Sequence, residues 1–265
     1  MARRIVSLSP NITEIVFALG QGHRLVGVTS YCKYPPQAAR LPKCGGAMDT
    51  DLEKILTLQP DLVLIHGQHP TAVQLCRENR IPMLRTSPND LKSLYEAISA
   101  LGKGLGCTEQ ADALVAGMTR EIARVRSAVK GRPRAKVFLS MSRSPDRITS
   151  LPTTNGEGFV SKMLDAAGGQ NVFANTDVLY PKVSLDELVR RRPEVIIEVT
   201  GRPISDADHS RMLGQWEALP SIPAVAARRV YFVIDDFAMI PGPRVPRLAR
   251  RFAELLHPDL KGRFD

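Results

Sequence analysis

Two histidines, His66 and His69, have the spacing with the clearest chemical potential in the sequence. Neutral imidazole is a good ligand for transition metals, and an H-x-x-H pair can place two rings on one side of a helix. Here the pair encloses Gly67 and precedes Pro70, which indicates a loop. Two interpretations stay open: polar loop side chains without a metal, or a His66 that contacts a ligand and serves as an axial ligand to its cobalt or iron.

Polar and aromatic side chains gather where the expected strands end. Open parallel sheets bind ligands beyond the carboxyl ends of their strands. If the two halves of the chain face each other, these groups line one cleft, and their guanidinium forks and aromatic faces suit a large, partly anionic ligand. The candidate ligand-binding residues are Ser9, Tyr31, His66 and Arg85 in the first half, and Arg143, Tyr180, Arg202, Asp236 and Phe237 in the second, with Ser142 and Thr200 beside them.

Several catalytic motifs are absent from the sequence. There is no nucleophile elbow, no phosphate-binding Gly-x-x-x-x-Gly-Lys and no Gly-x-Gly-x-x-Gly after the first expected strand. An enzyme, such as a metal chelatase or lyase, would require His66 within hydrogen-bond reach of a carboxylate such as Asp236. No feature of the sequence demands that arrangement. We therefore assign no catalytic residue and no prosthetic group, and an enzyme is the less favoured alternative.

The composition is that of a globular protein with a basic surface. The 265 residues carry a net charge of +9 from 36 basic and 27 acidic side chains, and only 5% are aromatic. Because no basic stripe is interleaved with aromatics, nucleic acid is not an expected partner. No stretch of about 18 apolar residues occurs, so no transmembrane helix is expected. The first residues lack an apolar signal core, which leaves open a removed signal peptide or a protein made without one.

The four cysteines are Cys32, Cys44, Cys76 and Cys107. None of them forms a C-x-x-C pair, so a structural zinc site is not expected. Free buried thiols are favoured, which leans against an oxidising compartment. The sequence does not decide whether Cys32 and Cys44 pair with each other.

The elements that must position the candidate residues follow an α/β pattern. In the first half, expected strands at 4–8, 25–29, 62–65 and 81–84 alternate with helices, which predicts a parallel sheet with flanking helices. In the second half, strands are expected at 136–140, 195–197 and 229–234, an extended piece at 171–173, and helices at 156–167, 211–218 and 245–256. Stretches 51–69 and 185–202 share a Leu-x-x-Leu helix, a proline and a strand, which suggests two similar lobes.

One long helix is expected between the two halves. Residues 108–130 carry a helical stripe of apolar side chains and contain no proline. At 1.5 Å per residue, such a helix spans roughly 30 Å and makes a stiff connection. The predicted organisation is an N-terminal α/β lobe at 1–107, a connecting helix at 108–131 and a C-terminal α/β lobe at 132–265.

Several segments, in the same order along the chain, carry a family resemblance. They read RIVSLSPNITE at 4–14, VGVTSY at 26–31, YPP at 34–36, PDLV at 60–63, AGGQNVF at 167–173, YPKVS at 180–184 and GPR at 242–244. Together they resemble the class III periplasmic substrate-binding proteins of ABC importers, which take up siderophores, haem and cobalamin. The chain is most similar to the cobalamin-binding members of that family.

The resemblance implies two α/β lobes joined by one long helix, with the ligand held between them. It implies a monomer in the periplasm or on the cell surface that hands cobalamin or another metal chelate to an ABC transporter permease and catalyses no reaction. Members dock to the permease through a surface glutamate on each lobe; the first position falls near Ala72, and Glu78 and Glu217 are nearby candidates. An intracellular carrier or sensor of the same kind of ligand, in the cytoplasm, is the alternative.

The resemblance also bears on the ligand. His66 and Arg85 fall where the cobalamin-binding members place tryptophans against their ligand. Tyr180 falls where an aromatic residue lines the pocket, and Tyr31 matches unchanged. Because imidazole and guanidinium replace two indoles, a ferric siderophore or haem is an alternative to cobalamin.

Overall fold

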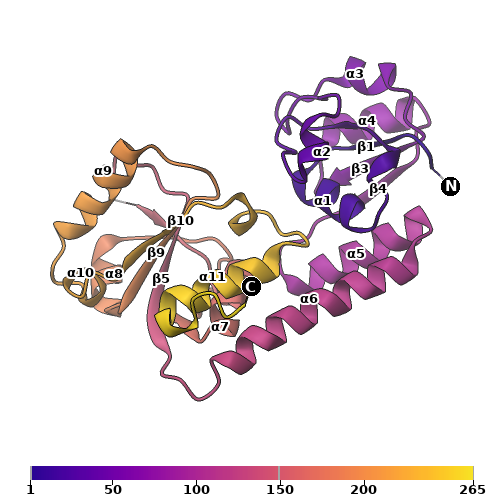
Figure 1. Cartoon of the computed structure of the whole chain (residues 1–265). Helices are drawn as coiled ribbons and strands as arrows, with labels where there is room; N and C mark the ends of the chain where they lie inside the picture. Colours follow the sequence, from indigo (N-terminus) through magenta and orange to yellow (C-terminus); the bar gives the residue numbers. More distant parts are fainter. Residues whose placement is uncertain (1, 149, 265) are drawn as a thin grey trace. The chain divides into compact units, whose positions relative to one another are not determined.

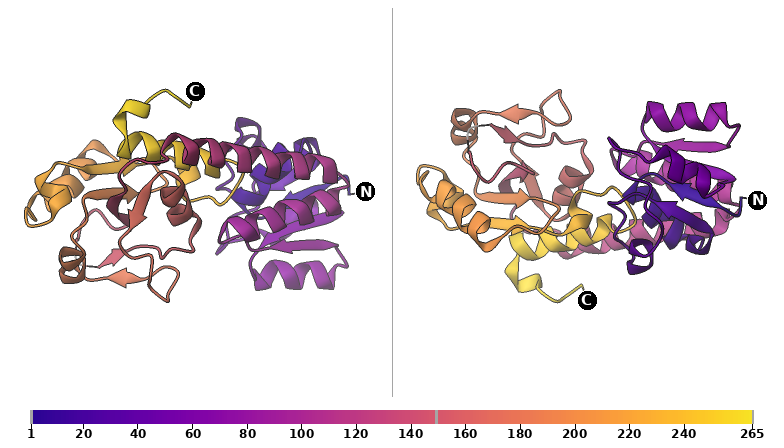
Figure 2. Two further views of the ribbon diagram at one scale, coloured as in Figure 1. Left: turned by 90° about the horizontal axis from the view of Figure 1, so that it is seen from below. Right: turned by 90° about the horizontal axis from the view of Figure 1, so that it is seen from above.

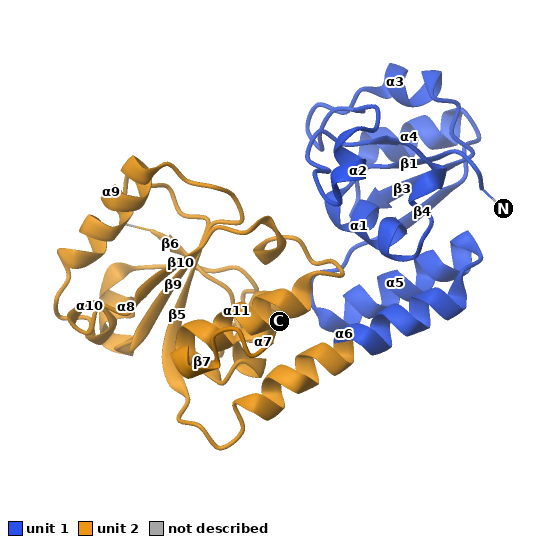
Figure 3. Ribbon diagram, viewed as in Figure 1, with its two compact units in different colours: residues 1–118 blue, residues 119–265 orange. Residues whose placement is uncertain are grey.

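The computed structural model describes residues 2–148 and 150–264 and divides into two compact units, residues 1–118 and 119–265 (Figures 1 and 3). Each unit has its own mainly parallel sheet with helices on both faces, as Figure 2 shows from two further sides. The α/β class predicted from the sequence is therefore confirmed. Among the residues described, no helix combines the length and the apolar character needed to cross a membrane.

The sheet of unit 1 has the strand order β2-β1-β3-β4, and every neighbouring pair is parallel. Alternate side chains of a strand point to opposite faces, so Val63 and Ile65 pack in a core with Ile55 of α3 and Cys76 of α4. Helices α1 and α5 pack against each other and against the strands. The strands are β1 (Ile5–Ser7), β2 (Leu25–Val28), β3 (Leu62–His66) and β4 (Met83–Thr86), and the helices are α1 (Pro10–Ala18), η1 (Gly22–Arg24), α2 (Pro36–Ala39), α3 (Leu52–Thr57), α4 (Pro70–Glu78) and α5 (Leu91–Leu105).

Asp61 fastens the N-terminus to the turn before β3. Its carboxylate accepts hydrogen bonds from the backbone N–H of Arg3 at 2.7 Å and of Arg4 at 2.9 Å. Partial burial acts to raise the pKa of this carboxyl, but the two backbone hydrogen bonds outweigh it and hold the pKa below its ordinary value. A carboxyl with a depressed folded pKa contributes stability above its unfolded pKa and loses it as pH falls through the folded pKa.

We therefore expect Asp61→Asn to lower the free energy of unfolding at pH 7 and to lose this effect as the pH falls below about 4. Urea unfolding of both proteins at several pH values measures the difference. The control is Asp112→Asn, which changes an exposed carboxylate that makes no hydrogen bond within the described part of the chain. An Asp61 effect that is equal at pH 7 and at low pH would contradict the explanation.

The sheet of unit 2 has the strand order β10-β9-β5-β7, again parallel throughout. On one face Phe138 lies edge-on to Phe173 and Trp216, in a core that includes residues of α8 and α10. Helices α7 and α11 pack together. The strands are β5 (Ala135–Met141), β6 (Leu151–Pro152), β7 (Gly169–Asn171), β8 (Lys182–Val183), β9 (Val195–Val199) and β10 (Val230–Val233), with β6 and β8 antiparallel, and the helices are α7 (Phe159–Ala166), α8 (Leu185–Arg191), α9 (Asp206–Glu217), α10 (Pro223–Ala226), η2 (Asp236–Ala238), α11 (Val245–Leu256) and η3 (Pro258–Leu260).

Helix α6 (Thr108–Ala128) is the long unbroken helix expected between the halves, and it contributes residues to both units. Its 21 residues make it about 30 Å long. Its second half belongs to unit 2, where Glu121 forms an ion pair with Arg250 and Arg124 donates to the carbonyl of Arg263. The division between the units therefore falls inside a continuous helix.

The cysteines are free and buried, as predicted. Burial, with the charge of Asp51 as a smaller cause, raises the pKa of the Cys44 thiol to about 11. Burial also raises the pKa of Cys76 and Cys107. A thiol that stays protonated is a poor nucleophile.

Three expected boundaries were wrong because pairing with a neighbouring strand decides where a strand lies. The strand expected at 81–84 is β4, in which Met83 pairs with Val63 and Arg85 lies within the strand. His66 is the last residue of β3 and not part of the loop. The extended piece expected at 171–173 is β7 at 169–171, where Gly169 pairs with Ala135. Separately, the helix expected at 156–167 is shorter and runs from Phe159 to Ala166.

Candidate functional site

The carboxyl ends of the four parallel strands of unit 1 lie along one edge of its sheet. Ile65 pairs with Arg85 and His66 with Thr86, so the end of β3 brings the imidazole beside β4. Arg85 donates from Nε and Nη2 to the carbonyl of Gly67, at 3.3 and 3.2 Å. Its side chain is exposed, and the hydrogen bonds orient it along the turn that follows β3. His66 and Arg85 therefore lie at the same edge of the sheet, but their side chains leave it on opposite faces, because Arg85 is level with Ile65.

His66 contacts the start of α1. Its Nδ1 is 3.3 Å from Nδ2 of Asn11, and Oδ1 of Asn11 accepts from the backbone N–H of Ile12 at 2.9 Å and from the hydroxyl of Ser9. Ser9 is buried, so its hydroxyl is committed to Asn11. Burial lowers the pKa of His66, which favours a neutral imidazole at neutral pH. Ser9, Asn11 and His66 form one connected group.

His69 belongs to a different group and does not share a partner with His66. It has a left-handed backbone, with φ of 39°, at the start of α4. Its Nε2 is 3.2 Å from the hydroxyl of Thr50, which donates to the carbonyl of Gly46. No cluster of three or more His, Cys, Asp or Glu side chains suited to a metal ion occurs in the described part of the chain. The H-x-x-H spacing therefore places its two rings in separate hydrogen-bond networks.

Tyr31 follows β2 and is 65% exposed, which is unusual for a large aromatic ring. The ring lies over Gly46, where an added Cβ would come within 2.8 Å of Cε2. Gly46 is held in turn by Asp49, whose carboxylate accepts from its backbone N–H at 3.0 Å. An exposed aromatic ring that rests on a hydrogen-bonded backbone is suited to packing against a flat ligand.

In unit 2, Arg143 lies two residues after the end of β5 and points into the interior, with 5% of the residue exposed. Its Nε donates to the carboxylate of Glu198 at 2.5 Å, and its Nη1 donates to Oε1 of Gln215 at 2.7 Å. Nη2 donates to the carbonyl of Met212, and the guanidinium stacks 5.5 Å from the ring of Trp216. Every nitrogen of Arg143 has a partner inside the protein, so its evident role is to hold the loop after β5.

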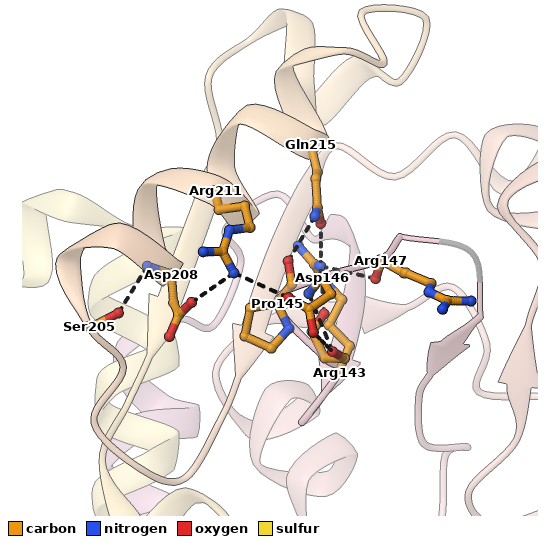
Figure 4. Close-up of polar contacts among 9 residues, drawn as sticks. Arg143, Pro145, Asp146, Arg147, Ser205, Asp208, Arg211 and Gln215 are labelled. Carbon is orange, nitrogen blue, oxygen red and sulfur yellow. Dashed lines mark hydrogen bonds and ion pairs between the residues drawn. The ribbon is translucent and has the colours of Figure 1, made fainter.

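A second set of contacts fastens the same loop from outside (Figure 4). Gln215 of α9 donates to the carbonyl of Pro145 at 2.8 Å, and Arg211 reaches Asp146 at 3.2 Å. Arg211 also pairs with Asp208, whose backbone N–H bonds the Ser205 cap of α9. Loop 142–147 is consequently fixed to helix α9 on both sides.

The remaining candidates of unit 2 follow β9 and β10. The hydroxyl of Thr200 donates to the carbonyl of Arg202 at 2.7 Å, which turns the chain and leaves the Arg202 side chain exposed. Asp236 and Phe237 lie in η2, where the buried Arg244 donates to Asp236 at 2.6 Å and stacks 5.8 Å from the Phe237 ring. Because its carboxylate is paired with Arg244, Asp236 is suited to orienting that neighbouring side chain.

Tyr180 lies in the segment that enters β8 and is half exposed. Its neighbours Leu179 and Pro181 accept backbone hydrogen bonds from Asn155 and Thr153, each at 2.9 Å. This short ladder fixes the backbone on both sides of the ring. Burial raises the pKa of the Tyr180 phenol, so it remains a neutral hydroxyl across the physiological range.

Four residues that shape these edges were missed from the sequence: Asn11, Glu198, Gln215 and Arg244. Glu198 left a usable signal, because a carboxylate inside the apolar run 195–199 must find a cation or a donor when it is buried. Asn11 follows a Ser-Pro pair at a helix start, a position typical of local capping, and its bond to His66 spans 55 positions of sequence.

Comparison with known proteins gives consistent relatives. A family model described as periplasmic binding protein matches residues 5–236. The vitamin B12-binding protein of Vibrio parahaemolyticus is 28% identical over 243 residues, which cover 91% of this chain and 84% of that protein. The solved periplasmic vitamin B12-binding protein of Vibrio cholerae is 26% identical, with a TM-score of 0.77 and 98% of both chains covered. The apo periplasmic haem-binding protein of Roseiflexus sp. RS-1 is also 26% identical, with a TM-score of 0.79, 97% of this chain and 99% of that one.

Proposed function

Because the chain belongs to the periplasmic binding protein family, we propose that it captures a metal-chelate ligand, cobalamin or a similar corrinoid, and delivers it to an ABC importer permease. The observation that carries this proposal is the pair of carboxyl edges, one in each unit, that present polar and aromatic side chains on ordered backbone. The ligand in this proposal is cargo, not a prosthetic group. The protein acts as a monomer in the periplasm or on the cell surface.

The proposed ligand contacts are exposed or partly buried groups at the two edges and, for Tyr180, in the segment that enters β8. In unit 1 they are Tyr31, His66 and Arg85, and in unit 2 they are Tyr180, Arg202 and Phe237, with Asp236 orienting its neighbours. Ser9 and Arg143 support these groups from the interior, since both are buried and hydrogen-bonded.

A ferric siderophore or haem is the second candidate ligand, and the chemistry of the unit 1 edge favours it. Arg85 is an exposed cation and His66 a neutral imidazole, and both suit anionic oxygens better than an uncharged aromatic face would. One structural relative at 26% identity is named for haem binding. The vitamin B12-binding names of other relatives support the first candidate.

A ligand screen tests the proposal. We expect at least one of cyanocobalamin, ferric haem and a panel of ferric siderophores to bind with submicromolar affinity, measured by quenching of tyrosine and tryptophan fluorescence. Tyr31→Ala and Tyr180→Ala should each weaken that ligand by about 5- to 30-fold, because each removes about 1–2 kcal/mol of aromatic contact.

The matched control is Leu56→Ala, which truncates an exposed apolar side chain at the carboxyl end of α3. That end of α3 leads into β3 and lies at the amino edge of the sheet, so affinity should not change. Failure of every chelate to bind, together with turnover of a small substrate, would overturn the binding-protein proposal.

A further inference from the structure

The orientation of the Asn11 amide is decided by its neighbours. A backbone N–H can only donate, so the amide atom 2.9 Å from the nitrogen of Ile12 must be the oxygen. The Ser9 hydroxyl donates to the same oxygen. The nitrogen Nδ2 is therefore the atom that faces Nδ1 of His66 at 3.3 Å. Because an amide NH₂ has only donors, Nδ1 of His66 must act as the acceptor.

This contact determines which nitrogen of His66 carries the proton. A neutral imidazole has one N–H, and with Nδ1 accepting, the proton lies on Nε2. Burial of the ring favours the neutral form. Nε2 makes no hydrogen bond to another described residue and is not one of the fully buried polar atoms that lack a partner. It is therefore open to solvent, as an N–H donor.

We propose that His66 donates a hydrogen bond from Nε2 to an acceptor oxygen of the ligand and is not an axial ligand to the ligand's metal. Coordination would need the lone pair of Nε2 and would move the proton to Nδ1. That proton would then face the N–H of Asn11. A turn of the amide would not relieve the conflict, because Nδ2 would then face the backbone N–H of Ile12.

The neighbouring guanidinium indicates the class of oxygen. Arg85 uses Nε and Nη2 for the carbonyl of Gly67, and its Nη1 makes no hydrogen bond to the other described residues. The register of β3 and β4 keeps this cation beside the end of β3. An N–H donor and a cation that leave opposite faces of one sheet edge suit a ligand with anionic oxygens at its rim, such as carboxylates, phosphates or catecholates. This assignment rests on the proposed function, whereas the position of the proton does not.

The proton position is measured on the full chain without ligand. With ¹⁵N-labelled histidine, long-range ¹H–¹⁵N NMR correlation at pH 7 should show His66 as the Nε2–H tautomer, with assignment from His66→Gln. In Asn11→Asp, a carboxylate oxygen faces Nδ1 and accepts, so the proton should move to Nδ1 or the ring should become an imidazolium. A wild-type His66 that is Nδ1–H or imidazolium at pH 7 would overturn the inference.

The second arm uses ferric haem as the probe. His66→Gln keeps an N–H donor without an imidazole, whereas His66→Leu removes both. We expect the Gln variant to bind within about 3-fold of wild type and the Leu variant about 10-fold or more weakly, the loss expected for a hydrogen bond to a charged acceptor. The absorption and electron paramagnetic resonance spectra of bound haem should be the same for wild type and the Gln variant.

The possible failures are distinguishable. An equal loss of affinity in both variants, with a changed haem spectrum, would mean that His66 coordinates the iron and would overturn the inference. If wild type binds neither haem nor any other chelate, the proposed function fails, and the NMR tautomer still decides whether Nε2 is a donor.

Discussion

Replacing Arg143 by methionine is expected to lower the free energy of unfolding of unit 2 by about 3–5 kcal/mol. The substitution leaves the carboxylate of Glu198 buried without its cation, and only the indole N–H of Trp216, at 2.7 Å, still donates to it. The other carboxylate oxygen, Oε2, already lacks a partner among the described residues. Trp216 is the only tryptophan of the chain and touches both members of the pair, so its fluorescence during urea unfolding reports on this region.

Two further variants distinguish the effect of the unpaired buried charge from an unspecific loss of stability. The double variant Arg143→Met, Glu198→Met removes both charges and should recover most of the loss, because a buried ion pair replaced by apolar residues is often neutral. Arg211→Met removes an arginine whose ion pairs to Asp146 and Asp208 are half exposed, and should cost at most about 1 kcal/mol. A double variant as unstable as Arg143→Met alone would contradict the explanation.

Gly45→Ala is expected to lower the free energy of unfolding of unit 1 by about 2–4 kcal/mol, from a left-handed backbone and from crowding. Gly45 has a φ of +73°, and an added Cβ would lie 2.1 Å from the carbonyl oxygen of Asp49 and 2.9 Å from the backbone nitrogen of Asp51. Both are backbone atoms, so the loop itself must move. Far-UV circular dichroism during urea unfolding measures the loss.

The control is Gly20→Ala. Gly20 has nearly the same φ, +74°, but an added Cβ meets no atom within 4 Å, so the variant should lose only the conformational term of about 1–2 kcal/mol. Equal losses at the two glycines would mean that contact with Asp49 does not matter. Because the carbonyl of Gly45 also accepts from Ser30, next to Tyr31, we expect Gly45→Ala to weaken ligand binding and Gly20→Ala to leave it unchanged.

The sequence was a good guide wherever a local pattern decides the structure. The last helix runs from Val245 to Leu256 as predicted, since its apolar stripe begins at Pro246 and ends before Pro258. The proline-free stripe of α6 predicted one unbroken helix for the same reason. The parallel sheets followed from the alternation of strands with helices.

The candidate site was less predictable because its details depend on partners far away in sequence. Arg143 was a candidate ligand-binding residue, but its side chain is buried and donates to Glu198, 55 positions later. Nothing local to Arg85 indicated that it pairs in register with Ile65. The two histidines look like a metal pair in sequence, whereas Asn11 and Thr50 commit them to separate networks. Such relations arise from tertiary packing, which a single sequence does not contain.

The attachment of loop 142–147 to helix α9 has a consequence for the thermodynamics of recognition. A loop that orders only on binding subtracts about 0.5–1.5 kcal/mol from the affinity for each side chain it immobilises. Here Arg143, Gln215 and Arg211 remove that freedom when the chain folds. A ligand that fits this loop gains its contact energy without the entropic cost of ordering these side chains. The loop cannot rearrange to improve its contacts with a ligand of another shape. If the proposed ligand contacts this loop, the fixed loop favours a ligand that already fits it over one that does not.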